Sequence, residues 1–241
     1  MCIRDRPNSV PMENVKGVVE FKNVSFRYDK AENDVIENIS FKSLPGQTTA
    51  FIGATGSGKS TLVNLIPRFY DVTDGSIEID GVDIRDVPQK ELRVNIGYVP
   101  QKGVLFSGDI ASNVRYGRQE ASDEEVWRAI EVAQAKEFVD SKEEGISSPI
   151  AQGGTNVSGC QKQRLSIARA LAKRPPIYIF DDSFSALDFK TDAEMCIRDS
   201  FERSEAQWDL IIAVGPCNSV PGVGERLPAK ISPLLNPCGQ A

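Results

Sequence analysis

A glycine-rich segment between a short apolar run and an amphipathic stretch constrains this chain most. Residues 53–61 read GATGSGKST, the apolar run Ala50–Ile52 precedes them, and Leu62 and Leu65 follow at helical spacing. Gly53, four further residues and then Gly-Lys-Ser form the spacing of a P-loop, and a strand before and a helix after are its usual context. The segment therefore predicts an α/β P-loop domain.

The residue types within this loop suit a triphosphate. Glycines allow backbone N–H groups to surround phosphates without Cβ clashes, and a helix beginning near Ser60 adds the positive end of its dipole. Lys59 supplies a charge for the β- and γ-phosphates, and the Ser60 hydroxyl suits Mg²⁺. A turn that only joins a strand to a helix would not need these two side chains. The loop residues predicted to bind the nucleotide are Gly53, Thr55, Gly56, Ser57, Gly58, Lys59, Ser60 and Thr61.

A second apolar run, IYIFDD at 177–182, predicts a buried strand that presents Asp181 and Asp182 at its carboxyl end. A carboxylate in that place holds Mg²⁺ as the second half of a P-loop site. Before it lies VSGCQKQRLSIARAL at 157–171, in which Ser158 fits the N-cap of a helix. The hydroxyl and the helix dipole suit a phosphate, although an ordinary capped helix is the alternative.

Composition excludes several other chemistries. The 241 residues include no histidine, which rules out Ser-His-Asp and Cys-His catalysis. Acidic residues outnumber basic ones by 34 to 28, so nucleic acid is not expected as a partner. No run approaches the roughly 18 apolar residues that span a bilayer. Any membrane role is therefore expected to come through a partner.

Together these motifs resemble the nucleotide-binding domain of ABC transporters, most closely the exporter type, over about residues 17–194. The resemblance implies an α/β cassette with a mixed sheet core, a small antiparallel β layer and an inserted helical subdomain at about 106–172. A capping box at Ser122–Glu125 opens a predicted helix in that insertion. Members of the family bind ATP and Mg²⁺ and hydrolyse ATP, so the chain is expected to be an ATPase.

The resemblance also implies roles for single residues. Tyr28 matches the aromatic side chain that stacks on adenine, although an aromatic residue at a strand end is often simple packing. The family's catalytic positions are matched by Asp182, Gln101 and Lys59. Its Mg²⁺ ligands are matched by Ser60, Gln101 and Asp181. Nucleotide contacts across a cassette dimer, from the signature segment and a later loop, are matched by Ser158, Gly159, Gln161 and Asp188.

The implied partners are the transmembrane domains of an exporter and a second cassette, at the cytoplasmic face of the plasma membrane. Where the family usually has glutamate after the Mg²⁺ aspartate, this chain has Asp182, and Gln152 replaces a usual glutamate before the signature. These two departures suggest the degenerate cassette of a heterodimeric exporter, paired with a different subunit. The alternative is a regulatory cassette that binds ATP with little hydrolysis of its own, which Asp182 and Cys160, in place of a usual glycine, favour.

A repeated hexapeptide divides the chain. Residues 1–6 read MCIRDR and residues 195–200 read MCIRDS, and both resemble translated sequencing-adapter sequence rather than a structural repeat. A diverged natural C-terminus is the alternative, and Leu210–Val214 can mimic the strand that precedes the family's switch histidine. The expected divisions are an adapter-like start and linker at 1–16, a C-terminally truncated nucleotide-binding domain at 17–194 and an artefactual or disordered tail at 195–241.

Overall fold

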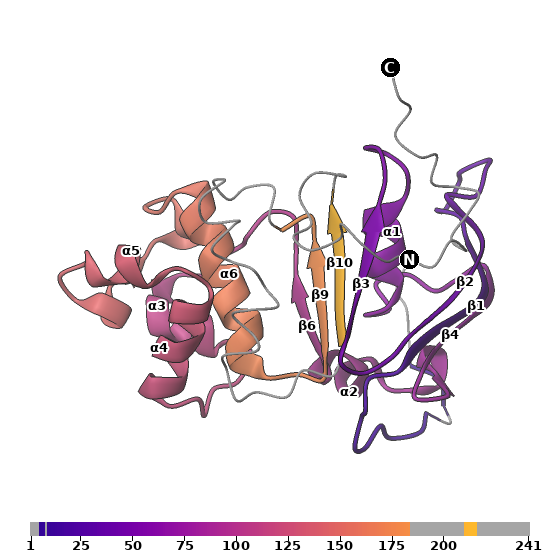
Figure 1. Cartoon of the computed structure of the whole chain (residues 1–241), viewed down its shortest axis with the longest axis horizontal. Helices are drawn as coiled ribbons and strands as arrows, with labels where there is room; N and C mark the ends of the chain where they lie inside the picture. The colour runs from indigo at the N-terminus through magenta and orange to yellow at the C-terminus, as the bar shows by residue number, and fades with distance from the viewer. Residues whose placement is uncertain (1–4, 8, 184–209, 216–241) are drawn as a thin grey trace.

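The computed structural model describes residues 5–7, 9–183 and the backbone of 210–215. Two sheets and a group of helices form its layers (Figure 1). A parallel sheet stands in the middle, with helix α6 (Gly159–Lys173) on one side and helix α1 (Lys59–Leu65) on the other. An antiparallel sheet lies beyond α1.

The antiparallel sheet has the order β2-β1-β4-β5. Its strands are β1 (Val19–Phe26), β2 (Ile36–Ser43), β4 (Asp74–Ile79) and β5 (Val82–Asp83). Strand β1 alternates buried and partly exposed residues until a bulge between Phe21 and Val24 shifts its register with β2. Because the bulge moves the alternation by one residue, Val24 and Phe26 stay on the buried face.

The central sheet has the order β3-β10-β9-β6, and its four described strands are parallel. They are β3 (Gln47–Ile52), β6 (Ile96–Val99), β9 (Ile177–Asp181) and β10 (Leu210–Gly215). On β9, Ile177 and Ile179 pack with α1 and the antiparallel sheet, whereas Tyr178 and Phe180 pack with the helices around α6. Both faces of β9 are covered, which explains its uninterrupted apolar run.

Strand β10 lies in the part of the chain that was expected to be an artefactual or disordered tail. It pairs with β3 from Leu210 opposite Gln47 to Gly215 opposite Ile52, and with β9 on its other side. These six residues form an ordered strand, because an extended apolar run satisfies the hydrogen bonds of both neighbouring strands, and the division at 195–241 stays a prediction. The adapter-like residues 195–200 lie outside the described residues.

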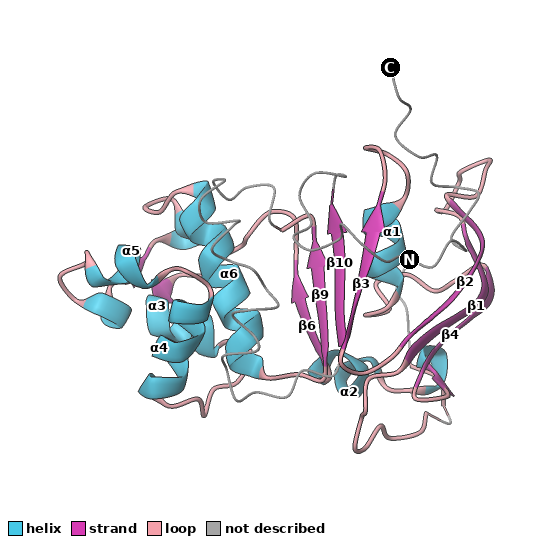
Figure 2. Cartoon of the chain, viewed as in Figure 1, coloured by secondary structure: helices cyan, strands magenta, loops and turns pink. Residues whose placement is uncertain are grey.

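The helical lobe contains α3 (Ile110–Arg115), α4 (Asp123–Val132), α5 (Lys136–Asp140) and α6, with a short ladder of β7 (Gly108–Asp109) and β8 (Pro149–Ile150) (Figure 2). Its 3-10 turns are η2 (Gly145–Ser147) and η3 (Gln152–Gly154). The predicted capping box of Ser122 and Glu125 is present at α4. Buried apolar side chains of α3, α4 and α6 form one cluster that continues onto the central sheet through Tyr178 and Phe180.

The remaining short helices lie outside the helical lobe, near the central sheet (Figure 1). Helix α2 (Gln89–Val94) and the 3-10 turn η1 (Ile84–Asp86) precede β6.

In the described ranges, no helix combines the length and the apolar character that a bilayer-crossing segment requires. The predicted α/β P-loop cassette fold is confirmed, with parallel and antiparallel pairing divided between the two large sheets.

Candidate phosphate and magnesium site

The glycine-rich loop joins β3 to α1 at the carboxyl edge of the central sheet (Figure 2). Gly56 and Gly58 have φ angles of +83° and +86°, which side chains with a Cβ rarely adopt. A Cβ on Gly58 would also lie 3.0 Å from Cδ1 of Ile36 and 3.1 Å from the carbonyl oxygen of Val35. The loop therefore needs glycine at 58 both for its turn and for its approach to β2.

The Lys59 ammonium is folded over the loop that carries it. It donates to the carbonyl oxygens of Gly53 at 2.7 Å and Ala54 at 2.8 Å, and it lies 3.4 Å from Oγ of Ser57. These contacts hold a positive charge at the first turn of α1, whose N-cap Gly58 provides no side-chain cap. A lysine charge beside uncapped helical N–H groups is an arrangement that favours phosphate.

Ser60 and Asp181 are 121 residues apart in the chain and meet at this edge of the sheet. The Ser60 Oγ donates to Oδ1 of Asp181 at 2.7 Å. The Asp181 residue is only 5% exposed, so its carboxylate is held in place by the surrounding strands and α1. A hydroxyl oxygen and a carboxylate oxygen beside a phosphate loop are ligands that Mg²⁺ prefers.

Two further predicted site residues, Gln101 and Asp182, contact each other. Gln101, in the loop after β6, donates from Nε2 to Oδ2 of Asp182 at 3.0 Å. Asp182 follows β9 directly and has a φ angle of +45°, a left-handed conformation that turns the chain at the end of the strand. The structure thus brings Lys59, Ser60, Gln101, Asp181 and Asp182 to one edge of the central sheet, and their roles in binding and catalysis stay predictions.

Tyr28 lies close to α1 and is engaged in packing. Its hydroxyl is 3.0 Å from Oγ1 of Thr61, and its ring makes edge-to-face contacts with Phe26 and Tyr70 at centroid distances of 4.8 and 5.2 Å. This is the packing role that the sequence left open. The stacking role of Tyr28 on adenine stays a prediction.

The signature segment lies on the helical lobe. Ser158 is the N-cap of α6, as predicted, and forms a capping box with Gln161. The Ser158 Oγ accepts from the Gln161 backbone N–H at 3.2 Å, and Gln161 Oε1 accepts from the Ser158 backbone N–H at 2.9 Å. Gly159 is exposed, and a Cβ added there would meet nothing within 4 Å. Asp188 lies outside the described residues.

Sequence reasoning missed two polar residues that contact the site, one buried and one partly buried. Gln163 is 1% exposed; its Oε1 accepts from the Gly103 backbone N–H at 2.8 Å and its Nε2 donates to the Pro100 carbonyl at 3.0 Å. It thereby ties the Gln101 loop to α6. Tyr98 is the second, and burial together with the Asp181 carboxylate raises the pKa of its hydroxyl. No local pattern marks either residue, because both act on distant segments.

Comparisons with known proteins show which family the chain resembles. The profile of the ABC transporter family matches residues 36–185. An uncharacterised ABC transporter ATP-binding protein of Mycobacterium tuberculosis is 50% identical over 188 residues, which cover 77% of this chain and 32% of that protein. The β-(1→2)glucan export ATP-binding/permease protein NdvA of Rhodopseudomonas palustris is 46% identical over 194 residues, which cover 80% and 32%.

Among solved structures, a bacterial Atm1-family ABC exporter with ATP bound matches with a TM-score of 0.81 and 37% identity. The match covers 88% of this chain and 37% of the exporter chain. The chain thus spans about a third of the length of the curated relatives it matches. From its profile match, its relatives and its fold, the chain belongs to the ABC transporter family and has the fold of the family's ATP-binding cassette.

Proposed function

We propose that the chain is the ATP-binding and ATP-hydrolysing part of an ABC exporter. The observation that carries the proposal is the meeting of Ser60 and Asp181 at 2.7 Å beside the phosphate loop. Those two side chains come from segments far apart in sequence, and their oxygens suit Mg²⁺ bound to a triphosphate. The name of the glucan-exporting relative and the ATP-bound exporter structure support the same class of function.

The residues present fit Mg²⁺ and ATP in charge and in donor type. The Lys59 ammonium beside the loop and the N–H groups at the uncapped start of α1 suit phosphate oxygens. Ser60 and Asp181 would hold the metal ion, with Gln101 close to Asp182 beside them. The metal ion, when bound, neutralises charge on the phosphates that develops during phosphoryl transfer.

Different residues of the chain have different roles in ATP hydrolysis. Lys59 and the loop amides stabilise phosphate charge, and Asp182 accepts a proton from the attacking water. Gln101 holds Asp182 through its amide and so couples the loop after β6 to that carboxylate. A second cassette lies face to face with this one and binds its own ATP. The residues of this chain that reach across the dimer interface toward that nucleotide are Ser158, Gly159, Gln161 and Asp188.

The proposed assembly is a membrane complex. The chain pairs with a second cassette, which is a different subunit with a glutamate at the position of Asp182, and both act on transmembrane domains. The assembly lies at the cytoplasmic face of the plasma membrane. The domain limits proposed for the cassette are 17–194, with the helical subdomain at about 106–172.

A single-turnover assay tests the proposal. The chain is mixed with radiolabelled ATP and Mg²⁺, alone and with a partner cassette that carries the glutamate, and phosphate release is followed beside equilibrium ATP binding. Binding of ATP with hydrolysis in at least one mixture is expected. Failure to bind ATP in the presence of Mg²⁺ would contradict the proposed function.

A second candidate function is a cassette in which ATP holds the dimer together while the partner hydrolyses. Asp182 favours it, because its carboxyl is one methylene shorter than a glutamate and a displacement near 1 Å costs on the order of a hundredfold in rate. Cys160 adds a Cβ at the signature position where the family has glycine. The same assay separates the two functions: hydrolysis by the chain alone contradicts the binding-only cassette.

A further inference from the structure

A tyrosine of β6 stands beside the metal carboxylate, and the proposed function gives it no part. Tyr98 is partly buried, and its ring packs edge-on against Phe69 at a centroid distance of 5.4 Å. Its hydroxyl donates to Oδ1 of Asn64 at 2.9 Å and also lies 3.3 Å from Oδ2 of Asp181. The phenol thus sits between α1, which begins at the phosphate loop, and β9, which carries Asp181.

The two oxygens of Asp181 have different protein neighbours. Oδ1 accepts from Ser60 at 2.7 Å, and Oδ2 faces the Tyr98 phenol. Since Asp181 is 5% exposed, protein donors contribute strongly to the orientation of its carboxylate. The phenol is a protein donor to the carboxylate oxygen that Ser60 does not contact.

The phenol has one proton and two acceptors, so Asn64 decides where the proton points. The phenol donates to Oδ1 of Asn64 at 2.9 Å, and Oδ2 of Asp181 lies 3.3 Å away as the second acceptor. Asn64 therefore competes with Asp181 for the phenol proton.

We propose that Tyr98 is a positioning residue for the Mg²⁺ carboxylate: its phenol holds Oδ2 of Asp181, so that Oδ1 stays directed at Ser60 and the metal. The inference rests on the proposed function, because it assumes that Asp181 and Ser60 hold Mg²⁺. Tyr98 lies three residues before Gln101 in the same segment. The segment that carries Gln101 therefore also sets the orientation of the carboxylate.

The test compares Tyr98→Phe with Tyr178→Phe in the full chain. Tyr178 is a matched control, since it is a fully buried tyrosine on the adjacent strand β9 and packs toward the helical lobe. Mn²⁺ replaces Mg²⁺ as a spectroscopic probe. Paramagnetic resonance gives the Mn²⁺ affinity at saturating ATP, and a fluorescent ATP analogue in excess chelator gives the metal-free nucleotide affinity.

Tyr98→Phe is expected to weaken Mn²⁺ roughly three- to tenfold, the effect of one hydrogen bond, and to leave metal-free nucleotide affinity within about twofold. Tyr178→Phe is expected to change neither. An unchanged Mn²⁺ affinity in Tyr98→Phe, or an equal loss of metal-free binding, overturns the proposal. If the wild-type chain binds no nucleotide, the proposed function itself has failed, which is a separate result.

A second variant keeps the proposal testable if Tyr98→Phe does not fold. Asn64→Ala removes the competing acceptor and leaves Asp181 as the remaining partner of the phenol. Mn²⁺ affinity is therefore expected to be retained or increased. A merely structural role for the trio predicts a loss in both variants, so a more than threefold weakening in Asn64→Ala contradicts the proposal.

Discussion

Helices α1 and α6 begin in opposite ways. Helix α1 starts at Gly58, which has a positive φ and offers no side chain to the first turn. Helix α6 starts at Ser158, whose hydroxyl accepts from Gln161 while the Gln161 side chain accepts from the Ser158 backbone. The N–H groups of α1 are therefore open to a ligand, whereas part of the first turn of α6 is already satisfied by the protein.

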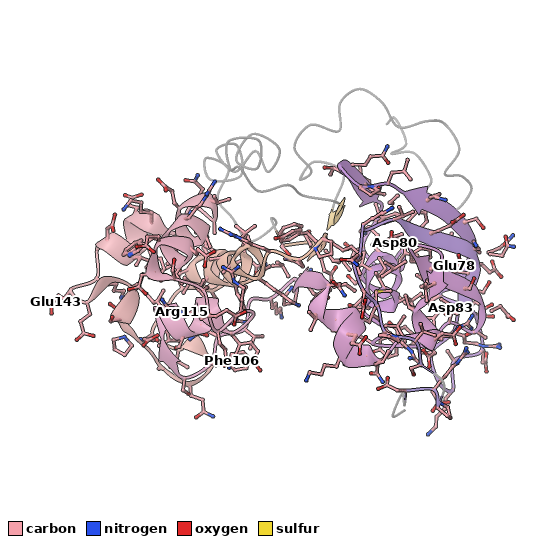
Figure 3. The ribbon with its side chains drawn as sticks, turned by 90° about the horizontal axis from the view of Figure 1, so that it is seen from below. Glu78, Asp80, Asp83, Phe106, Arg115 and Glu143 are labelled. Atoms are coloured by element: carbon pink, nitrogen blue, oxygen red, sulfur yellow. The ribbon has the colours of Figure 1, made fainter. Side chains whose placement is uncertain are left out.

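This difference indicates how the two helix starts meet a phosphate. A phosphate at α1 replaces solvent and gains N–H groups together with the Lys59 charge. A phosphate at α6 has to share Ser158 with the cap that stabilises the helix. Figure 3 shows the two lobes at opposite ends of the molecule, with Phe106 and Arg115 on the helical side and Asp80 on the core side.

The largest expected effect is the loss of ATP binding at the start of α1. Lys59→Ala removes the charge held at the first turn of α1, so ATP affinity should fall roughly tenfold to a hundredfold, and hydrolysis about a hundredfold or more. Equilibrium binding and single-turnover hydrolysis measure the two effects. The control is Lys90→Ala, at an exposed lysine of α2. Equal ATP affinity in Lys59→Ala and Lys90→Ala would show that α1 binds without this charge.

The next effect concerns Asp182, which follows β9 and contacts Gln101. Asp182→Asn cannot accept a proton and should lower single-turnover hydrolysis by about a hundredfold. Asp182→Glu lengthens the side chain toward the water and should raise hydrolysis by on the order of tenfold. ATP affinity should stay nearly constant in both. If all three forms hydrolyse ATP at the same rate, Asp182 is not the base.

The role of the α6 start can be tested by comparing two serines, Ser158 and Ser122, that cap their helices in the same way. Ser158→Ala and Ser122→Ala each remove the hydroxyl of a capping box, and each should lower the free energy of unfolding by about 1 kcal/mol. Only Ser158→Ala should also weaken ATP-dependent pairing with a second cassette. Denaturant unfolding and light scattering with ATP separate the two effects. Equal pairing in both variants would limit Ser158 to helix capping.

The smallest expected effect lies at the other end of α6. Lys173 donates to the carbonyl oxygens of Arg93 at 2.6 Å and Ile96 at 2.7 Å, and burial lowers its pKa to about 8. The ordinary lysine pKa in the unfolded chain is about 10.4, so between about pH 8 and pH 10.4 the unfolded chain binds more protons than the folded chain. The free energy of unfolding therefore rises with pH across this range, and this gain is lost as pH falls toward about 8.

Relative to Lys173→Met, the wild-type protein should therefore gain no more than about 0.5 kcal/mol of unfolding free energy between pH 7.5 and 8.5. Lys90→Met, at an exposed site, is the matched control and should show no such difference. Urea unfolding at each pH measures it. A parallel pH dependence of wild type and Lys173→Met would mean that Lys173 titrates as an ordinary lysine.

The sequence by itself determined the features that depend on near neighbours. The spacing from Gly53 to Ser60 gave the phosphate loop, the run at 177–182 gave a strand buried on both faces, and Ser158 gave the start of α6. Each of these follows from local geometry, because loop turns, strand alternation and helix caps are set within a few residues. The family resemblance then predicted what those motifs bind, namely ATP, Mg²⁺, transmembrane domains and a second cassette.

Only the tertiary structure decided which distant side chains touch. Ser60 meets Asp181 across 121 residues, and Gln101 meets Asp182 across 81, because the strand order places β3, β9 and β6 with their carboxyl ends at one edge. The placement of Leu210–Gly215 between β3 and β9 likewise follows from pairing on both sides. Such contacts depend on how whole strands and helices pack, which no single segment encodes.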